Sequence, residues 1–158
     1  MSGPSFEWAQ NRRLSEFIDI GLIGEPNQSI ADLSGNHDRL GPEDFRTSLI
    51  EFVDETWHLP LHEWTCEHFR TLVEQRMALE WIAETIAEFV DLHARIMITN
   101  YEGEVSILAL KALDDIQKVN PVAASRLRSL DYSWMCDEFA YNKDLQREAV
   151  VTLKRISN

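Results

Sequence analysis

The strongest periodic pattern in the chain covers residues 77–98 and predicts a long helix. Apolar side chains recur there at intervals of three and four positions, the spacing of residues on one helix face. These residues are Leu79, Ile82, Ala83, Ile86, Phe89, Val90, His93 and Met97. Three more apolar side chains widen this face: Trp81, Leu92 and Ile96. We therefore expect the helix to contact neighbours on more than one side and the rest of the chain to pack around it.

Similar patterns precede this segment and predict three more helices. The first is expected over residues 6–20, before Gly21 and Gly24 end the pattern. Pro42 predicts the start of the second, because proline suits a first helical turn and two acidic residues follow it. Its expected buried face is Phe45, Leu49, Phe52, Val53 and Thr56. The third follows Pro60, with Leu61, Trp64, His68, Phe69, Leu72 and Val73 inward and Glu63, Glu67, Arg70 and Glu74 outward.

The segment 24–42 has no periodicity and contains three glycines and two prolines. A stretch of this length is either a functional loop or loosely ordered. Ser29 is a good N-cap residue, so it is expected to begin a single helical turn over residues 31–33.

The last third of the chain contains a possible internal repeat. One helix is expected over residues 104–119, ended by Asn120 and Pro121, and another over 144–156. The segments 104–116 and 144–156 share an acid, an aliphatic residue, alanine, leucine and isoleucine at the same steps. This pattern resembles the second helix of a HEAT-like repeat, which implies stacked helix pairs with a curved protein-binding face. Two ordinary amphipathic helices would give the same matches.

These patterns together predict an all-α protein, because strand signals are absent. We expect a compact bundle or short α-solenoid of about seven helices, in one domain over residues 1–158. No apolar run is long enough to span a membrane, and the first residues lack the apolar core of a secretion signal, so a cytoplasmic location is expected. Cys66 and Cys136 are expected to be free thiols.

The net charge of −12 is unevenly distributed. Residues 43–91 hold twelve acidic and three basic residues, so three quarters of the excess charge lies in about one third of the chain. This distribution argues against a nucleic-acid partner and against binding to anionic membrane lipid, since both need a basic surface. It favours a basic protein partner or a divalent cation.

Three groups of residues invite a metal site, and each is incomplete. His58, His62 and Cys66 have spacing that suits zinc, but no fourth ligand is evident. Glu55 and His58 form a single Glu-x-x-His pair, whereas di-iron bundles need two. The doublet at 37–38 resembles that of HD-type phosphohydrolases, but the histidine that should precede it is missing. His68 and His93 fall on apolar faces, where a neutral histidine bonded to a carbonyl is common. We therefore expect no catalytic residue, no cofactor and no metal ligand.

The leading hypothesis is a non-enzymatic protein that inhibits a basic partner. Such a protein would resemble an immunity protein or antitoxin and would cover the cationic site of a toxin or nuclease. The expected partner-binding residues are Glu51, Asp54, Glu55, Glu63, Glu67, Glu74, Glu84, Glu88, Asp91 and Trp134. The alternatives are a metal-dependent helical enzyme and a helical-repeat scaffold or adaptor that binds through residues 100–156.

Overall fold

The computed structural model describes residues 9–157, whose regular secondary structure consists of helices joined by loops, with no β-strand. The prediction of an all-α fold is therefore confirmed. The helices are α1 (Ile30–Ser34), α2 (Ser48–His58), α3 (Cys66–Gln75), α4 (Leu79–His93), α5 (Glu104–Lys111), α6 (Leu113–Val119), α7 (Pro121–Ser129), α8 (Met135–Glu138) and α9 (Lys143–Ile156). Three short 3-10 helices accompany them: η2 (Leu14–Glu16), η3 (Ile20–Leu22) and η4 (Leu61–Glu63). Within this part of the chain, no helix combines the length and apolar character that crossing a membrane requires.

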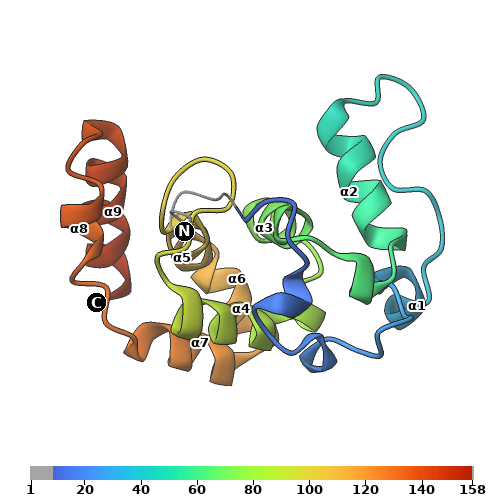
Figure 1. The fold of residues 1–158 in the computed structure, drawn as a ribbon, viewed down its shortest axis with the longest axis horizontal. Coiled ribbons are helices and arrows are strands. Elements are labelled where there is room, and N and C mark those ends of the chain that lie inside the picture. Colours follow the sequence, from blue (N-terminus) through green and yellow to red (C-terminus); the bar gives the residue numbers. More distant parts are fainter. Residues whose placement is uncertain (1–8, 158) are drawn as a thin grey trace, which may run out of the picture.

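The predicted central helix is α4, which packs against α5, α6, α7 and η3. Figure 1 shows it between α6 and α7 in the middle of the molecule. Six residues of the predicted face are buried as expected: Leu79, Ile82, Ala83, Ile86, Phe89 and Val90. Met97 lies beyond the end of the helix, and the prediction that Leu92 widens the apolar face is wrong, because Leu92 is 58% exposed. His93 ends the helix, and its Nε2 lies 2.8 Å from the carbonyl oxygen of Phe17, which ties the N-terminal segment to α4.

The predicted helix over residues 6–20 is wrong for the described residues, since η2 and η3 form there instead of an α-helix. Phe6 and Trp8 lie outside the described residues. The backbone of this segment bonds across to the chain before α3: the amide of Leu14 donates to the carbonyl of Trp64 at 2.9 Å. Because these groups pair with a distant segment, they are not available for an α-helix.

The second predicted helix starts later than expected. Thr47 is the N-cap of α2, and its side chain accepts a hydrogen bond from the amide of Ile50 at 3.1 Å. Pro42 therefore belongs to a loop. Phe45, which was expected in the core, is 95% exposed, and Leu49 is also exposed, whereas Val53 and Thr56 are buried as predicted.

Three further predictions are confirmed. Ser29 caps α1 with its side chain, the inward face of η4 and α3 is buried, and both cysteines are free. The prediction that Arg70 faces solvent is wrong, because the residue is only 7% exposed. The single helix expected over 104–119 is divided at Ala112, where ψ is 5° and the backbone leaves the helical region.

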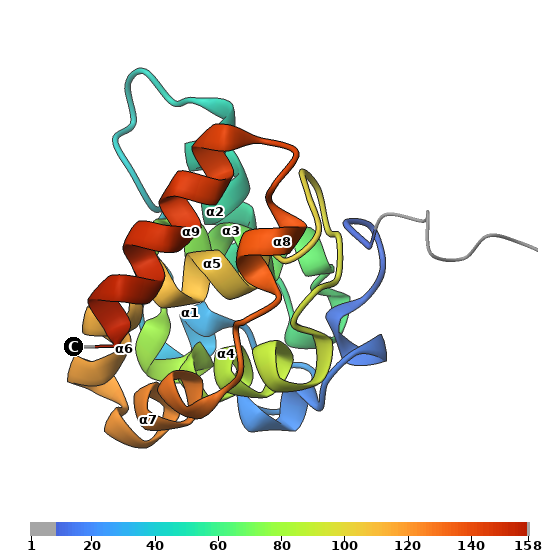
Figure 2. The same cartoon turned by 90° about the vertical axis from the view of Figure 1, so that its left-hand side faces the viewer.

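The helices at the two ends of the molecule flank a central group formed by α3 to α7. Figure 1 shows α2 at one end and α8 with α9 at the other. Figure 2 shows α9 lying across α5 with α8 beside it, in agreement with the contacts of α9 with both helices. The chain therefore presents two distinct end surfaces, one at α2 and one at α9.

Candidate functional site

The loop over residues 36–47 is held against α2 by side chains of the helix. The indole Nε1 of Trp57 donates to the carbonyl oxygen of Asn36 at 2.9 Å. Nearer the start of the helix, Asp54 accepts a hydrogen bond from the amide of Leu40 at 2.6 Å. These bonds satisfy backbone groups that a loop would otherwise leave to water, so they fix the loop's path over the helix.

Arg46 fastens the far part of this loop. Its side chain is only 8% exposed, and one guanidinium nitrogen donates to the carbonyl oxygens of Leu40 and Pro42, at 2.7 and 3.0 Å. The same guanidinium pairs with Glu51 and lies 3.6 Å from a carboxylate oxygen of Asp54. A buried charge is stable only when it is paired and hydrogen-bonded, and Arg46 has both kinds of partner. The loop is therefore rigidly connected to the first turns of α2.

Phe45 projects from this fixed loop into solvent. It has a φ of 58° and is 95% exposed. The left-handed conformation costs an L-residue with a bulky side chain roughly 1–2 kcal/mol. The aromatic ring gains no burial that would offset this cost. Backbone strain of this kind collects at functional sites, where the surrounding structure imposes it.

A shallow hollow of about 540 Å³ lies beside the first turns of α2. It is lined by Arg46, Thr47, Ser48, Glu51, Phe52, Asp54 and Glu55. Three carboxylates face one guanidinium there, so the hollow is net acidic. The carboxylate of Glu55 is 60% exposed and lies 3.3 Å from Nε2 of His68. Such a hollow has the charge to accept a lysine or arginine side chain.

His58 lies at the end of α2 and contacts the loop with both ring nitrogens. Its Nδ1 lies 2.9 Å from the carbonyl oxygen of Asp54, and its Nε2 lies 3.2 Å from that of His37. The pKa of His58 is raised, chiefly because the carbonyl of Asp54 favours the protonated ring. Partial burial lowers the pKa, whereas the carbonyl of His37 raises it further. Protonated His58 can donate to both carbonyls at once, whereas the neutral ring can donate to one.

The acidic residues predicted to bind a partner do not gather in one place. Seven of the nine pair with arginine or histidine side chains of this chain: Glu51, Asp54, Glu55, Glu67, Glu74, Glu88 and Asp91. Glu63 and Glu84 form no ion pair with the described residues. Glu51, Asp54 and Glu55 lie on α2. Glu67 and Glu74 pair with Arg70 on α3, and Glu88 and Asp91 pair with Arg126 of α7. Only those on α2 belong to the loop and the hollow.

The acids around Arg70 have an internal role. The Arg70 guanidinium makes two hydrogen bonds to Glu67, at 2.7 and 3.2 Å, and lies 4.0 Å from Glu104, which is 1% exposed. Glu104 also accepts from the backbone amides of Thr99 and Asn100, at 2.6 and 3.1 Å. Burial opposes ionisation of Glu67, but hydrogen bonds from Arg70 and Thr99 outweigh it and lower the pKa of that carboxyl. This cluster joins α3 to α5 and to the loop before α5.

Trp134 lies at the other end of the molecule. It is the residue before α8, and its ring is 6.4 Å from that of Phe139 in a T-shaped arrangement. The guanidinium of Arg95 lies 5.6 Å from the centre of its ring. The indole Nε1 donates to the carbonyl of Asp131 at 3.2 Å. Trp134 is therefore packed into the α8 corner, away from the acids of α2.

Three of the candidate metal ligands have other partners or surroundings. The ring nitrogens of His58 face carbonyl oxygens, as described above, and His37 lies 2.9 Å from Asp32. Burial raises the pKa of the Cys66 thiol to about 12, so the thiol stays protonated at neutral pH. Across residues 9–157, no group of three or more His, Cys, Asp or Glu side chains is arranged to hold a metal ion.

Sequence reasoning missed two residues that shape this surface, Phe45 and Arg46. The signal that could have found them is Thr47 followed by Ser48 and Glu51, a run typical of a helix N-terminus. Placing the N-cap at Thr47 would have left Phe45 in the loop.

Comparisons with protein-family profiles, curated proteins and solved structures gave no significant match. The resemblance to a HEAT-like repeat stays a prediction. Its second segment, 144–156, lies wholly within α9, whereas its first, 104–116, is divided between α5 and α6 at Ala112. The function must therefore be argued from the surfaces themselves.

Proposed function

We propose that this protein is a non-enzymatic inhibitor of a basic protein, of the immunity or antitoxin kind, and that it binds through Asp38–Glu55, here named the loop–α2 surface. The observation that carries the proposal is the exposed, strained Phe45 on a loop fixed by Arg46. The partner would offer an apolar pocket for the phenyl ring. A basic side chain beside that pocket would enter the acidic hollow.

The energetic argument begins with Phe45. Burying an exposed phenyl ring in a partner's pocket contributes roughly 1.5–3 kcal/mol, and the backbone strain at Phe45 is already present in the unbound protein, so binding does not add it. Because the loop is already ordered by α2, binding does not have to order it. An exposed aromatic side chain on an ordered backbone can act as a binding hot spot when a partner buries it.

The charge of the surface selects the partner. The loop–α2 surface contains six acidic residues and two arginines, a net charge of −4. Glu43, Glu51 and Glu55 are each at least half exposed even where they pair within the chain. Complementary charge speeds association and disfavours acidic partners. A toxin or nuclease with a cationic active site has the required character.

The proposal is tested by capturing partners from the native host with the intact protein and identifying them. The dissociation constant of each captured protein is then measured for the wild type and for Phe45→Ala. We expect a basic protein whose affinity falls by about 30-fold or more in Phe45→Ala, the loss of a hot-spot side chain. The matched control is Val122→Ala, because Val122 is 79% exposed on α7, outside the loop–α2 surface. It should bind as the wild type does.

A second variant tests the role of charge. Glu55→Lys reverses an exposed carboxylate of the hollow and should slow association most at low ionic strength, where charges are least screened. The proposal is wrong if every captured protein is acidic, or if Phe45→Ala and Val122→Ala bind equally well.

A further inference from the structure

A second surface, at the opposite end of the molecule, is basic. A groove of about 420 Å³ lies between α5 and α9. It is lined by Arg76, Lys111, Asp144, Arg147, Glu148, Val151, Thr152 and Arg155. Four of these side chains are basic and two are acidic, so the groove has a net charge of +2 in a chain of net charge −12. Basic residues collected against the overall charge indicate a local anion preference.

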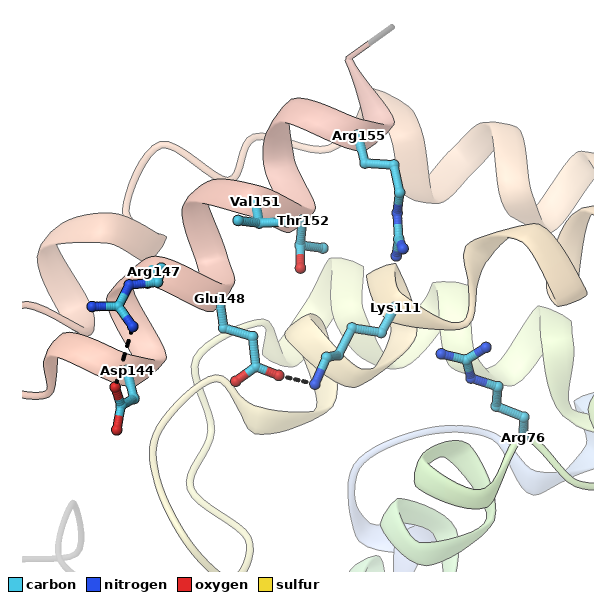
Figure 3. A pocket seen from close by; sticks show the side chains of 8 residues that line it. All are labelled: Arg76, Lys111, Asp144, Arg147, Glu148, Val151, Thr152 and Arg155. Carbon is cyan, nitrogen blue, oxygen red and sulfur yellow. Dashed lines mark ion pairs between the residues drawn. The ribbon is translucent and has the colours of Figure 1, made fainter.

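The basic side chains reach the groove from three elements. Arg76 is the C-cap of α3, Lys111 ends α5, and Arg155 lies in the last turn of α9. Figure 3 shows the side chains of Arg76 and Arg155 directed into the space beside α5, and the Lys111 ammonium pointing away from them toward Glu148. The hydroxyl of Thr152, a residue that is 3% exposed, points from α9 toward the same space.

Three of the four bases form ion pairs within the chain, Arg147 with Asp144 at 3.7 Å among them, and the side chains that line the groove still sum to a positive charge. Lys111 pairs with Glu148 across the groove, and Arg76 lies 3.2 Å from Asp115, outside it. Arg155 forms no ion pair with residues 9–157. Since both carboxylates lie at the surface and are partly exposed, each pair is weak and can rearrange at little cost.

We infer that this groove binds a small molecule that carries phosphate. The planar guanidinium groups of Arg76 and Arg155 match pairs of phosphate oxygens, and Lys111, which pairs with Glu148 in the unbound protein, supplies a compact positive charge on the other side of the groove. The Thr152 hydroxyl adds a neutral donor. Val151 gives the groove an apolar wall for the rest of the ligand, and the volume lies within the range of small-molecule sites.

The test uses inorganic pyrophosphate as the probe and the full chain. Amide shifts in two-dimensional NMR are followed during titration, with sodium chloride at equal ionic strength as the reference. We expect saturable shifts at Lys111, Thr152 and Arg155. Arg155→Gln should weaken binding about tenfold, the contribution of a charge-assisted hydrogen bond.

The matched control is Lys154→Gln, which removes the same charge from the neighbouring, exposed position of α9. It should leave pyrophosphate binding unchanged. Shifts that do not saturate, or equal weakening by the two variants, would overturn the inference, because both indicate a nonspecific response to charge. Saturable binding of a polyglutamate peptide without any binding of pyrophosphate would also overturn it.

Discussion

At the scale of single residues, Arg46 and Arg70 show how this acidic chain uses its few buried bases. Each guanidinium is largely buried and gathers carboxylates from more than one position in the sequence. Arg46 connects a loop to α2, and Arg70 connects α3 to α5. Both arginines therefore hold separate parts of the fold together through ion pairs, in a protein whose excess charge is negative.

Replacing Arg70 with methionine should lower the free energy of unfolding by about 3 kcal/mol or more. Methionine fills part of the volume, but Glu67 and Glu104 lose the positive charge that compensates them in a buried position. Urea unfolding followed by circular dichroism measures the change. The control is Arg147→Met, since Arg147 is 75% exposed and pairs weakly with Asp144, so its loss should cost less than about 1 kcal/mol. Equal effects of the two substitutions would contradict the role of Arg70 in connecting α3 to α5.

Phe45→Gly should stabilise the protein, although it removes a large apolar side chain. Glycine relieves left-handed strain of roughly 1–2 kcal/mol and adds roughly 0.5–1 kcal/mol of chain entropy to the unfolded state, so a net gain of about 0–1.5 kcal/mol is expected. Phe45→Ala keeps the strain and should leave stability nearly unchanged, because the ring is exposed. Thermal unfolding separates the two variants. A loss of stability in Phe45→Gly would mean that the ring is not solvent-exposed in solution.

At the scale of elements, α2 shows where sequence patterns succeed and fail. The apolar spacing of Val53 and Thr56 correctly predicted the inner face of the helix. Pro42 wrongly predicted its start, because a proline-acid sequence also suits a loop when its backbone groups find partners elsewhere. Those partners are the side chains of Arg46 and Asp54. Such contacts depend on the folded loop and leave no periodic signal.

The loop over residues 36–47 should loosen as pH rises. His58 has a raised pKa, so its stabilisation of the loop is fully present below its unfolded pKa of about 6.5 and is lost as pH rises through the higher folded value. Hydrogen exchange, corrected for the intrinsic pH dependence of the rate, should show loop protection falling over this range. His58→Gln cannot titrate and should remove the response.

The comparison with His58→Gln is needed because His37 also lies in this loop, next to Asp32. A peptide from α4 gives the reference for global changes. If the wild type and His58→Gln respond identically to pH, the response belongs to another group and the assignment to His58 is wrong.

At the scale of the whole molecule, the sequence predicted the helical class and the central place of α4 but not the distribution of charge in space. The high density of acids over residues 43–91 suggested one acidic flank. In the fold, Arg126 approaches Glu88 and Asp91 from a segment more than thirty positions away, at 3.1 and 2.8 Å. Arg126 thus offsets part of the charge on α4, whereas Arg46, His68 and Arg70 pair with acids inside the segment itself. Linear charge density cannot reveal the pairing of Arg126, which depends on how α7 crosses α4.

Local stability should decrease from the centre of the molecule toward α9. Helix α4 buries eight residues, whereas α9 buries Ala149 and Thr152. Since opening α9 exposes less apolar surface, its amides should exchange with a free energy at least about 1.4 kcal/mol below that of α4, or tenfold faster. Native-state hydrogen exchange at constant pH measures both helices together. Equal exchange free energies would mean that α9 opens only with global unfolding. If the groove beside α9 binds pyrophosphate, saturating pyrophosphate should slow exchange in α9 and leave α2 unchanged, because α9 contributes side chains to the groove and α2 contributes none.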